Sequence, residues 1–378
     1  MDKHLHVIAL NVPYPPNYGG IIDIYYKLRA LHGLGVKLIL HCFEYERPPA
    51  PELEQICEKV YYYRRRTGLI ANITLLPYNV YSRKNPRLME NLLQDKHPIL
   101  FEGLHSCYYL DDKRLANRLK IYRAGNIEHD YYRLLARSCR SLPTKLFLLV
   151  EARRFRRYEK VLASADRMLG ISLADTGYLR QRFPGKSVDF VPAFHAGEQV
   201  TAVEGRSDFV LYHGKLSVFE NEHVALFLIE RVFSRLDCPC VVAGMNPSQR
   251  ILSAAAPYPH ITVEANPTAE RMDCLLHEAH IHLLITFQDT GLKLKLLNAL
   301  FAGRHIVANR LMLAGSGLDA LCHAADLPDE MLAACRRLMN EPFTTDAIRF
   351  RRSVLLPAYS PTHQATRLLQ MLPQDSAN

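Results

Sequence analysis

Two lysines near one predicted helix start are the residues whose type and spacing most directly suggest chemistry. Lys293 and Lys295 begin a predicted helix over residues 291–302, after a predicted strand over residues 281–286. Free N–H groups at a helix start attract anions, and lysine side chains add positive charge to them. Asn298, further along the helix, offers an amide group for hydrogen bonds. The helix start could therefore bind an anion, with two solvated surface lysines as the alternative.

Glycine-containing loops follow two other predicted strands. Gly19 and Gly20 open a helix after the first apolar run, and Gly214 precedes Lys215 after a strand over residues 209–213. Glycine lets a ligand approach the backbone closely, and the helix that follows offers unpaired N–H groups to phosphate or sugar oxygens. The alternative is that each loop is an ordinary turn.

Five polar residues follow the predicted strands over residues 99–101 and 120–123. They are Glu102, His105, Arg123, Asn126 and Glu128. An arginine, an amide and carboxylates placed together can hold a polyhydroxylated ligand through several directed hydrogen bonds. Two structural alternatives stay open: His105 could be a buried structural histidine, and Asn126 could cap a helix with Glu128 in its first turn.

The elements that must position these residues alternate between strand and helix in both halves of the chain. Predicted strands cover residues 4–12, 36–43, 99–101, 120–123, 168–171, 209–213, 239–243, 261–264, 281–286 and 306–308. Predicted helices cover residues 21–34, 221–236, 269–279, 291–302 and 361–372. The alternation predicts an α/β protein with two doubly wound parallel sheets, joined by a polar segment over residues 192–207. Such sheets bind ligands at the carboxyl ends of their strands.

Charge is unevenly distributed along the 378 residues. Residues 1–190 carry 31 Lys and Arg against 19 Asp and Glu, a net charge of +12, whereas residues 191–378 have a net charge of −3. The basic run is densest at Arg153, Arg154, Arg156, Arg157 and Lys160. A basic half predicts an anionic partner, and a membrane surface, a lipid phosphate and nucleic acid all fit, with solvated helix faces as the alternative.

Composition and residue order exclude several classes of protein. The chain is 48% hydrophobic and 22% charged, which is globular composition and excludes a disordered or collagen-like chain. The first apolar run is too short to span a membrane and lacks the pattern of a signal peptide. Nine cysteines without a regular framework fit a reducing cytoplasm. We expect no metal site, and Cys238 and Cys240 are interpreted as core residues of a strand.

Several of these segments resemble motifs of GT-B glycosyltransferases, especially the large retaining family four (glycosyl transferases group 1). Pro15, Pro16, Gly19 and Gly20 resemble the family's first loop, and Arg123, Asn126 and Glu128 resemble its R-x-x-N-x-E segment. Residues 212–216 stand where the family has its GxL turn, and residues 290–303 match its EGFGLPLLEAMACG signature in length and apolar pattern. The resemblance covers nearly the whole chain. It implies two Rossmann-like domains facing each other across a cleft, with a C-terminal helix that crosses back to the first domain.

The resemblance also implies a role for each domain and its residues. Residues 1–192 with the tail 358–378 would form the acceptor domain, and residues 193–357 the donor domain. The implied donor-binding residues are Gly19, Gly20, Gly214, Lys215, Asp289, Thr290, Gly291, Leu292, Lys293, Lys295 and Asn298. The implied acceptor-binding residues are Glu102, Arg123, Asn126 and Glu128, and the implied catalytic residues are His105, Lys215 and Lys295.

Three positions depart from the family pattern. Glu220 occupies the place of a lysine that contacts the donor diphosphate, and Thr290 and Asn298 replace two glutamates eight residues apart. A carboxylate cannot neutralise a diphosphate, so a substitute cation is needed nearby, and Lys293 and Lys295 are the candidates. The lysines resemble a divergent branch of the family with a GxKxKLLxAL pattern.

The sequence therefore predicts a metal-independent glycosyltransferase that takes a sugar from a GDP- or UDP-linked donor, with retention implied by the family only. The acceptor would be a cell-surface glycan or a lipid-linked glycan, which would place a cytoplasmic protein at the inner face of a membrane. Two alternatives remain: a nucleotide-sugar epimerase on the same fold, and a non-catalytic binding or partner subunit. Nucleic-acid binding is unlikely to be the function, because no nucleic-acid module accompanies the basic runs.

Overall fold

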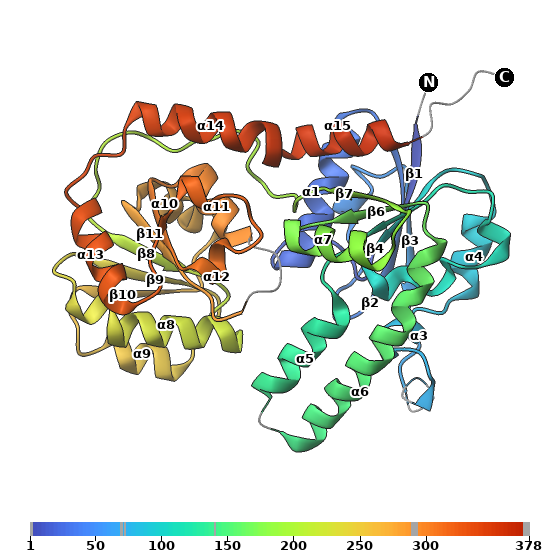
Figure 1. The fold of residues 1–378 in the computed structure, drawn as a ribbon, viewed down its shortest axis with the longest axis horizontal. Helices are drawn as coiled ribbons and strands as arrows, with labels where there is room; N and C mark the ends of the chain where they lie inside the picture. The colour runs from blue at the N-terminus through green and yellow to red at the C-terminus, as the bar shows by residue number, and fades with distance from the viewer. Residues whose placement is uncertain (1–2, 69–70, 72, 140, 289–293, 373–378) are drawn as a thin grey trace. The chain divides into compact units, whose positions relative to one another are not determined.

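The chain forms two compact units in a computed structural model that describes residues 3–68, 71, 73–139, 141–288 and 294–372 (Figure 1). The first unit holds the described residues up to Phe194 and from Pro361 onward. The second unit holds the described residues from His195 to Ser360.

A seven-stranded parallel sheet organises the first unit, in the order β3-β2-β1-β4-β5-β6-β7. Its strands are β1 (His4–Ile8), β2 (Lys37–Glu44), β3 (Lys59–Arg64), β4 (Ile99–Glu102), β5 (Lys120–Arg123), β6 (Arg167–Gly170) and β7 (Ser187–Phe190). Its helices are α1 (Gly19–Gly33), α3 (Tyr78–Tyr81), α4 (Pro86–Leu92), α5 (Glu128–Ser138), α6 (Leu142–Tyr158), α7 (Leu173–Arg182) and α15 (Pro361–Met371). Helices cover both faces of the sheet, so its central strands are buried on both sides.

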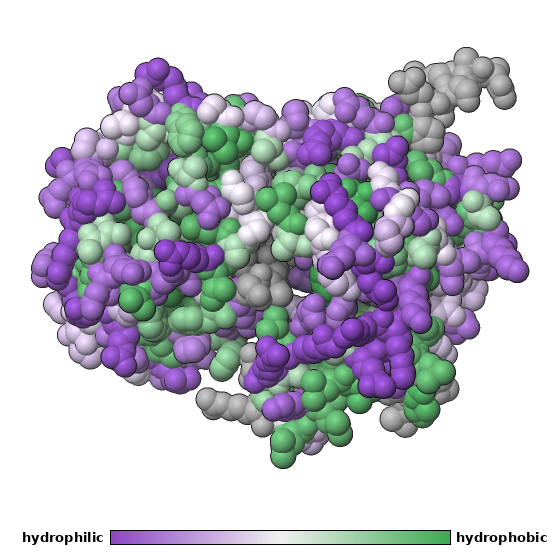
Figure 2. All heavy atoms as spheres, viewed as in Figure 1, coloured by the Kyte–Doolittle hydropathy of each residue, from purple (hydrophilic) through white to green (hydrophobic). Residues whose placement is uncertain are grey.

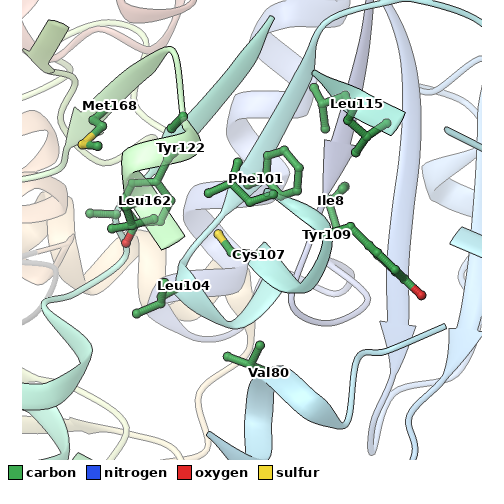
Figure 3. Close-up of a cluster of buried hydrophobic side chains, with 14 of the residues drawn as sticks. Ile8, Val80, Phe101, Leu104, Cys107, Tyr109, Leu115, Tyr122, Leu162 and Met168 are labelled. Atoms are coloured by element: carbon green, nitrogen blue, oxygen red, sulfur yellow. The ribbon is translucent and has the colours of Figure 1, made fainter. Parts of the chain in front are cut away.

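Two apolar cores lie on opposite sides of this sheet. One contains Phe101, Cys107 and Tyr122 with the side chains drawn in Figure 3. The other joins Leu28 of α1 to Leu368 of α15, so the last helix packs against the first. The prediction that the C-terminal helix returns to the first domain is therefore confirmed.

A six-stranded parallel sheet organises the second unit, in the order β10-β9-β8-β11-β12-β13. Its strands are β8 (Val210–His213), β9 (Cys240–Gly244), β10 (Ile261–Ala265), β11 (Ile281–Leu284), β12 (His305–Ala308) and β13 (His323–Ala324). Its helices are α8 (Phe219–Arg231), α9 (Gln249–Ala255), α10 (Ala269–Glu278), α11 (Leu294–Ala302), α12 (Arg310–Leu313), α13 (Pro328–Leu338) and α14 (Thr345–Tyr359).

Both sheets have the doubly wound order, and this order fixes where each unit can bind a ligand. The chain reverses its winding direction between β1 and β4 in the first unit, and between β8 and β11 in the second. Loops leave the carboxyl ends of adjacent strands in opposite directions at such a switch point, which opens a crevice for ligands. The predicted α/β class with two doubly wound sheets is confirmed.

Several elements differ from the sequence prediction. Strands β3 and β7 and helix α6 were not predicted, and α5 was anticipated only through the alternative that a helix begins near Asn126. The helix predicted over residues 221–236 ends at Arg231, because Val232 leaves helical geometry at φ −124° and a short 3-10 turn follows. Gly35, which lies after α1 at φ +80°, ends that helix as the sequence predicts.

Candidate functional site

Two helix starts carry the chemistry at the switch point of the second unit. Helix α8 begins just after β8, and α11 begins after β11. Lys295, in the first turn of α11, donates from Nζ to Asn221 Oδ1 of α8 over 2.8 Å, and its ammonium lies 5.4 Å from the centre of the Tyr212 ring. The structure thus brings a cation from one helix start to the other, where an anion would meet the N–H groups.

Glu220, the carboxylate that stands where the family has a lysine, lies in this first turn of α8 and accepts a hydrogen bond from Thr286 Oγ1. Asn309 fixes Thr286 in turn, because its Oδ1 accepts from the Thr286 N–H over 3.1 Å and its Nδ2 donates to the Thr286 carbonyl over 2.7 Å. Glu220 is therefore held toward β11, while the adjacent Asn221 holds Lys295. Lys295 therefore lies next to the position where the resemblance requires a substitute cation, and its role there stays a prediction.

His213 is the last residue of β8, at the carboxyl end of the strand. Its imidazole is buried, and its Nε2 has no hydrogen-bond partner among the described residues. Burial, with a smaller contribution from the Lys295 ammonium, lowers the pKa of His213 to about 3. The ring is therefore neutral at pH 7, with one ring nitrogen unsatisfied, and a ligand that entered the crevice could complete its hydrogen bonding.

The remaining residues predicted to bind a donor have different positions. Lys215 is exposed in the loop after β8, where Asn221 Nδ2 donates to its carbonyl over 3.1 Å, and Asn298 is half-buried on α11. Five predicted residues lie outside the part of the chain that is described: Asp289, Thr290, Gly291, Leu292 and Lys293. Lys215, Lys293 and Lys295 are the only lysines in residues 195–378, so every lysine of this half belongs to the predicted site.

Close backbone packing positions the loop that contains Gly214. Gly244 ends β9 at φ +158°, and a Cβ on it would lie 1.8 Å from the Gly214 carbonyl oxygen. Only glycine fits there, so the loop after β8 rests directly on the end of β9.

In the first unit, Gly19 and Gly20 form the first residues of α1, directly after the loop that leaves β1. Tyr18 precedes them with no side-chain cap. Apart from its chain neighbours and the backbone of α1, no atom of the described residues lies within 4 Å of where a Cβ of Gly20 would be. The helix start is open to its surroundings, as the sequence predicts for a phosphate or sugar contact.

A buried histidine and a buried carboxylate face each other near the end of β4. His105 lies in the 3-10 helix η2 (Leu104–Tyr109), between Leu104 and Cys107 of the core drawn in Figure 3. Its Nδ1 is 3.5 Å from Oε1 of Glu128, the first residue of α5. Neither His105 Nδ1 nor Glu128 Oε2 has a hydrogen-bond partner among the residues that the structure describes.

The pKa values of this pair are shifted in opposite directions. Burial, aided by the charges of Arg83 and Arg65, lowers the pKa of His105 to about 3. Burial raises the pKa of Glu128 to about 8, although Arg83 opposes this shift. At pH 7 the histidine is neutral and the carboxyl is largely protonated, so the pair forms a polar, uncharged surface.

Arg83 and its neighbours are the residues that sequence reasoning missed. The Arg83 guanidinium is buried and donates to the carbonyls of Leu10, over 3.0 Å, and Asn79, over 2.5 Å. Asn79 also donates to the Tyr132 hydroxyl over 2.5 Å. Arg83 lies in a polar stretch, YSRKNPR, in which nothing marks one arginine as buried.

Glu102 and Arg123, predicted to bind an acceptor, lie in a buried ion network. Arg123 donates to both carboxylate oxygens of Asp23, and Lys27 Nζ is 2.8 Å from Glu102 Oε1. Asp23 also accepts from the Phe194 N–H over 2.7 Å, and Arg123 donates to the Pro192 carbonyl over 2.9 Å. These four side chains are therefore engaged with one another, and Asp23 and Arg123 also hold the backbone at Pro192 and Phe194, just before the chain enters the second unit.

Asn126 is half-buried two residues before α5. The N-cap of α5 is Ile127, with no side-chain hydrogen bond at the cap. The alternative that Asn126 caps the helix is therefore wrong, whereas Glu128 does lie in the first turn as expected.

The shifted carboxyl gives a pH-dependent prediction. Folding raises the pKa of Glu128 from its ordinary value near 4.5 to about 8, so the folded protein binds this proton more tightly. The resulting stabilisation is complete below about pH 4.5 and is lost as the pH rises through about 8. Glu128→Gln, which cannot titrate, should therefore gain stability relative to the wild type progressively from about pH 4.5 to about pH 8 in denaturation experiments, with no further gain at higher pH.

The matched control is Glu90→Gln, which removes an exposed carboxylate from α4 of the same unit. Its stability difference from the wild type should stay flat over the same pH range. A flat difference for Glu128→Gln would show that Glu128 titrates at its ordinary pH.

Comparison with known proteins gives one sequence relative and many structural ones. No protein-family model matches the chain. An uncharacterized 44.6 kDa protein of the cps region of Klebsiella pneumoniae is 26% identical over 348 residues, which is 87% of this chain and 88% of that protein. TarM is similar with a TM-score of 0.69 at 8% identity, over 98% of each chain.

Two further solved structures are similar over nearly their full length. A glycosyltransferase from Rickettsia africae ESF-5 has a TM-score of 0.66 at 10% identity, over 98% of this chain and 97% of that one. Anabaena Alr3699/HepE, solved in complex with UDP and glucose, has a TM-score of 0.64 at 9% identity, over 98% of this chain and 99% of that one. With two doubly wound units and these neighbours, the chain has the GT-B fold of glycosyltransferases.

Proposed function

We propose that the protein is a glycosyltransferase that moves a sugar from a nucleoside diphosphate donor, such as a GDP- or UDP-sugar, to a glycan or lipid-linked acceptor. The observation that carries the proposal is Lys295, placed beside the first turn of α8 at the switch point of the second unit. The likeness to a structure solved with UDP and glucose supports a nucleotide-sugar donor. The relative from a cps region supports a role in polysaccharide biosynthesis.

In this proposal the second unit stabilises the leaving group. The bond from the anomeric carbon to the diphosphate oxygen breaks, a bond to an acceptor hydroxyl oxygen forms, and the proton of that hydroxyl passes to the departing diphosphate, which leaves with negative charge. Lys215, Lys293 and Lys295, with the N–H groups at the starts of α8 and α11, would stabilise that charge in the transition state. Asn298 would hydrogen-bond the ribose hydroxyls. The lysines supply the charge that a metal ion would otherwise supply, so we propose a metal-independent reaction, retaining as in family four.

The first unit would hold the acceptor. Its open α1 start, with Gly19 and Gly20, offers N–H groups, and Glu128 with Asn126 offers polar groups for hydroxyl oxygens. The pKa of Glu128, about 8, suits proton transfer at neutral pH, whereas His105, with a pKa of about 3, is a weak base and suits a hydrogen-bonding role. We propose that Glu102 and Arg123 contribute on the acceptor side by way of the buried ion network that holds them.

A thermal-shift panel tests the donor site. GDP, UDP, dTDP, CMP and their sugar conjugates would be added at millimolar concentration, with magnesium and with EDTA. One nucleoside diphosphate should raise the melting temperature equally in both, because a ligand at about 100 times its dissociation constant adds about 2.7 kcal/mol to stability. Stabilisation that needs magnesium would overturn the metal-independent mechanism.

If no nucleotide of the panel raised the melting temperature, this result would favour the second candidate, a non-catalytic GT-B binding subunit. The observation behind this candidate is that Glu220 places a carboxylate in the first turn of α8, where a diphosphate needs positive charge. A subunit of this kind would keep its partner when Lys295 is replaced, whereas an enzyme would lose transfer.

No helix among the described residues is both long and apolar enough to cross a membrane. A lipid-linked acceptor would nevertheless bring the protein to a membrane surface, and we propose a cytoplasmic protein that acts at the inner face.

A further inference from the structure

The helix pair α5 and α6, here called the hairpin (residues 128–138 and 142–158), carries an unusual exposed surface. Five apolar side chains in the first half of α6 are exposed: Leu142 by 77%, Leu146 by 65%, Phe147 by 41%, Leu149 by 45% and Val150 by 42%. Figure 2 shows hydrophobic residues gathered at the lower end of the hairpin, with hydrophilic residues above them. Large apolar side chains gathered on a surface in this way mark an interaction site.

The second half of α6 presents basic residues on the same face. Leu142, Leu146 and Leu149 follow one another at helical spacings of four and three residues, and Arg153 and Arg156 continue that series. Lys160 comes just after α6 ends, in the 3-10 helix η4 (Glu159–Ser164). A single stripe of the helix surface is therefore apolar near residue 142 and cationic near residue 156.

The cationic end of this stripe lines a cavity of about 510 Å³. Its lining residues are Arg133, Leu149, Ala152, Arg153, Arg156, Arg157, Lys160 and Arg182. Arg153, Arg156, Arg157 and Lys160 are exposed and have no carboxylate within ion-pair distance in the described part of the chain. A cavity lined by cations without carboxylates suits phosphate groups.

A second apolar projection lies beside the hairpin. Ile73 and Leu75 are 79% and 89% exposed, and they precede Tyr78, whose N–H donates to Glu151 of α6 over 2.7 Å. The hydrogen bond ties this segment to the middle of α6. Apolar side chains are thus presented by two neighbouring segments of the first unit.

We propose that the hairpin is a membrane-docking element whose tip enters an anionic phospholipid bilayer. Residues 142–150 span about 12 Å along the helix, close to the depth at which apolar faces enter the boundary between headgroups and acyl chains. With the tip inserted, the arginines and Lys160 lie at the level of the lipid phosphates. This membrane-docking role extends the proposed function and depends on it in one respect, the lipid-linked nature of the acceptor.

The arrangement favours a bilayer over other anionic partners. Nucleic acid would bind the cations but would leave the apolar residues in water, since its backbone offers them no contact. A second copy of the chain would cover the apolar residues, but its arginines would then lie against the arginines of the first copy. Only a bilayer offers an apolar layer next to a layer of negative charge, in the order that α6 presents them.

Vesicle co-sedimentation of the full-length protein tests the proposal. Vesicles of phosphatidylcholine alone would be compared with vesicles that contain about one third phosphatidylglycerol. The wild type should bind the anionic vesicles at least about tenfold more tightly, because each basic residue near an anionic surface contributes about 1 kcal/mol, or about fivefold. Equal binding to both vesicles, or no binding, would overturn the proposal.

Two variants separate the charges from the apolar tip. Arg153→Glu/Arg156→Glu/Arg157→Glu should weaken binding to anionic vesicles by about a hundredfold or more. Leu146→Ser/Phe147→Ser should weaken it by about tenfold and make the remaining binding more sensitive to salt. Matched controls are Phe350→Ser and Arg349→Glu, which change exposed residues of α14. These should bind as the wild type does.

Two further readouts keep this proposal separate from the others. Nucleotide-dependent thermal shifts should be unchanged in the hairpin variants. Loss of these shifts in a variant would indicate that the variant is misfolded. Vesicle binding by a wild type that shows no thermal shift with any nucleotide would contradict the donor site but not the membrane-docking element. Light scattering tests for a second copy on the hairpin. A dimer that Leu146→Ser/Phe147→Ser dissociates, together with unchanged vesicle binding, would overturn the membrane assignment.

Discussion

Lys295→Met should reduce sugar transfer by about a hundredfold to a thousandfold and remove the thermal shift given by the nucleoside diphosphate. A preorganised donor aimed at charge that develops in a transition state contributes about 10²–10³ in rate. In the proposed mechanism Lys295 is such a group, and its Nζ is held 2.8 Å from Asn221 Oδ1 at the start of α8. Methionine keeps most of the side-chain volume, so the loss should reflect charge more than packing. Isothermal titration with the diphosphate, and product analysis of transfer, measure both effects.

A compensating change makes this test sharper. If Lys295 supplies the cation that Glu220 cannot, then Glu220→Lys in the Lys295→Met background should restore part of the diphosphate affinity. Lys295→Arg should retain affinity, and Arg337→Gln, a charge change on the exposed face of α13, should leave both measurements unchanged. Wild-type affinity in Lys295→Met would contradict the proposed donor site.

The donor half of the site shows what sequence patterns can predict. The strands and helices that lead to Lys215, Lys295 and Asn298 follow from apolar periodicity and glycine positions, and the structure confirms them. The expectation of a substitute cation near Glu220 came from the family resemblance, because Glu220 stands where the family has a lysine. The sequence pattern did not show the geometry around Glu220. Thr286 and Asn309 hold Glu220 to one side, through contacts that join separate strands.

The acceptor half was harder to predict, for a physical reason. Burial of a charged residue depends on partners that are distant in the sequence, and no local pattern marks them. Arg123 and Glu102 have the types of ligand-binding residues, but Asp23 and Lys27, far away in the chain, take up their charges. Arg83 is a buried arginine in a polar stretch.

The hairpin was also not predicted, although the residues that mark it lie within one short stretch of sequence. Its basic run, from Arg153 to Lys160, was recognised as a charged segment that could meet something anionic. Its apolar residues begin at Leu142 and share a face with the arginines, so neither half shows the alternation of apolar and polar faces that marks an ordinary surface helix. The helix becomes evident only when the apolar residues and the basic residues are placed together on one face of it.

Asp23→Asn should destabilise the first unit by about 3–5 kcal/mol, because it leaves buried cations without one of their two carboxylates. Burial opposes the charge on Asp23, but Arg123, Lys27 and the Phe194 N–H outweigh it and lower the pKa of Asp23. Wild type has two cations and two carboxylates in the network, so its buried charge is balanced. The variant keeps the shape of the side chain and removes only the charge. Denaturation by urea, monitored by circular dichroism at pH 7, measures the difference.

The comparison with an exposed pair shows whether burial causes this effect. Asp130→Asn breaks an ion pair with Arg133 over 3.0 Å, in which both side chains are at least 40% exposed, and it should cost about 1 kcal/mol or less. Arg123→Met, which leaves an excess of negative charge in the same network, should be about as costly as Asp23→Asn. Because Asp23 and Arg123 also bond the backbone of Phe194 and Pro192, both variants should loosen the end of the first unit, seen as faster amide exchange at Phe194. A loss for Asp23→Asn no larger than that for Asp130→Asn would mean that water reaches the network and screens its charges.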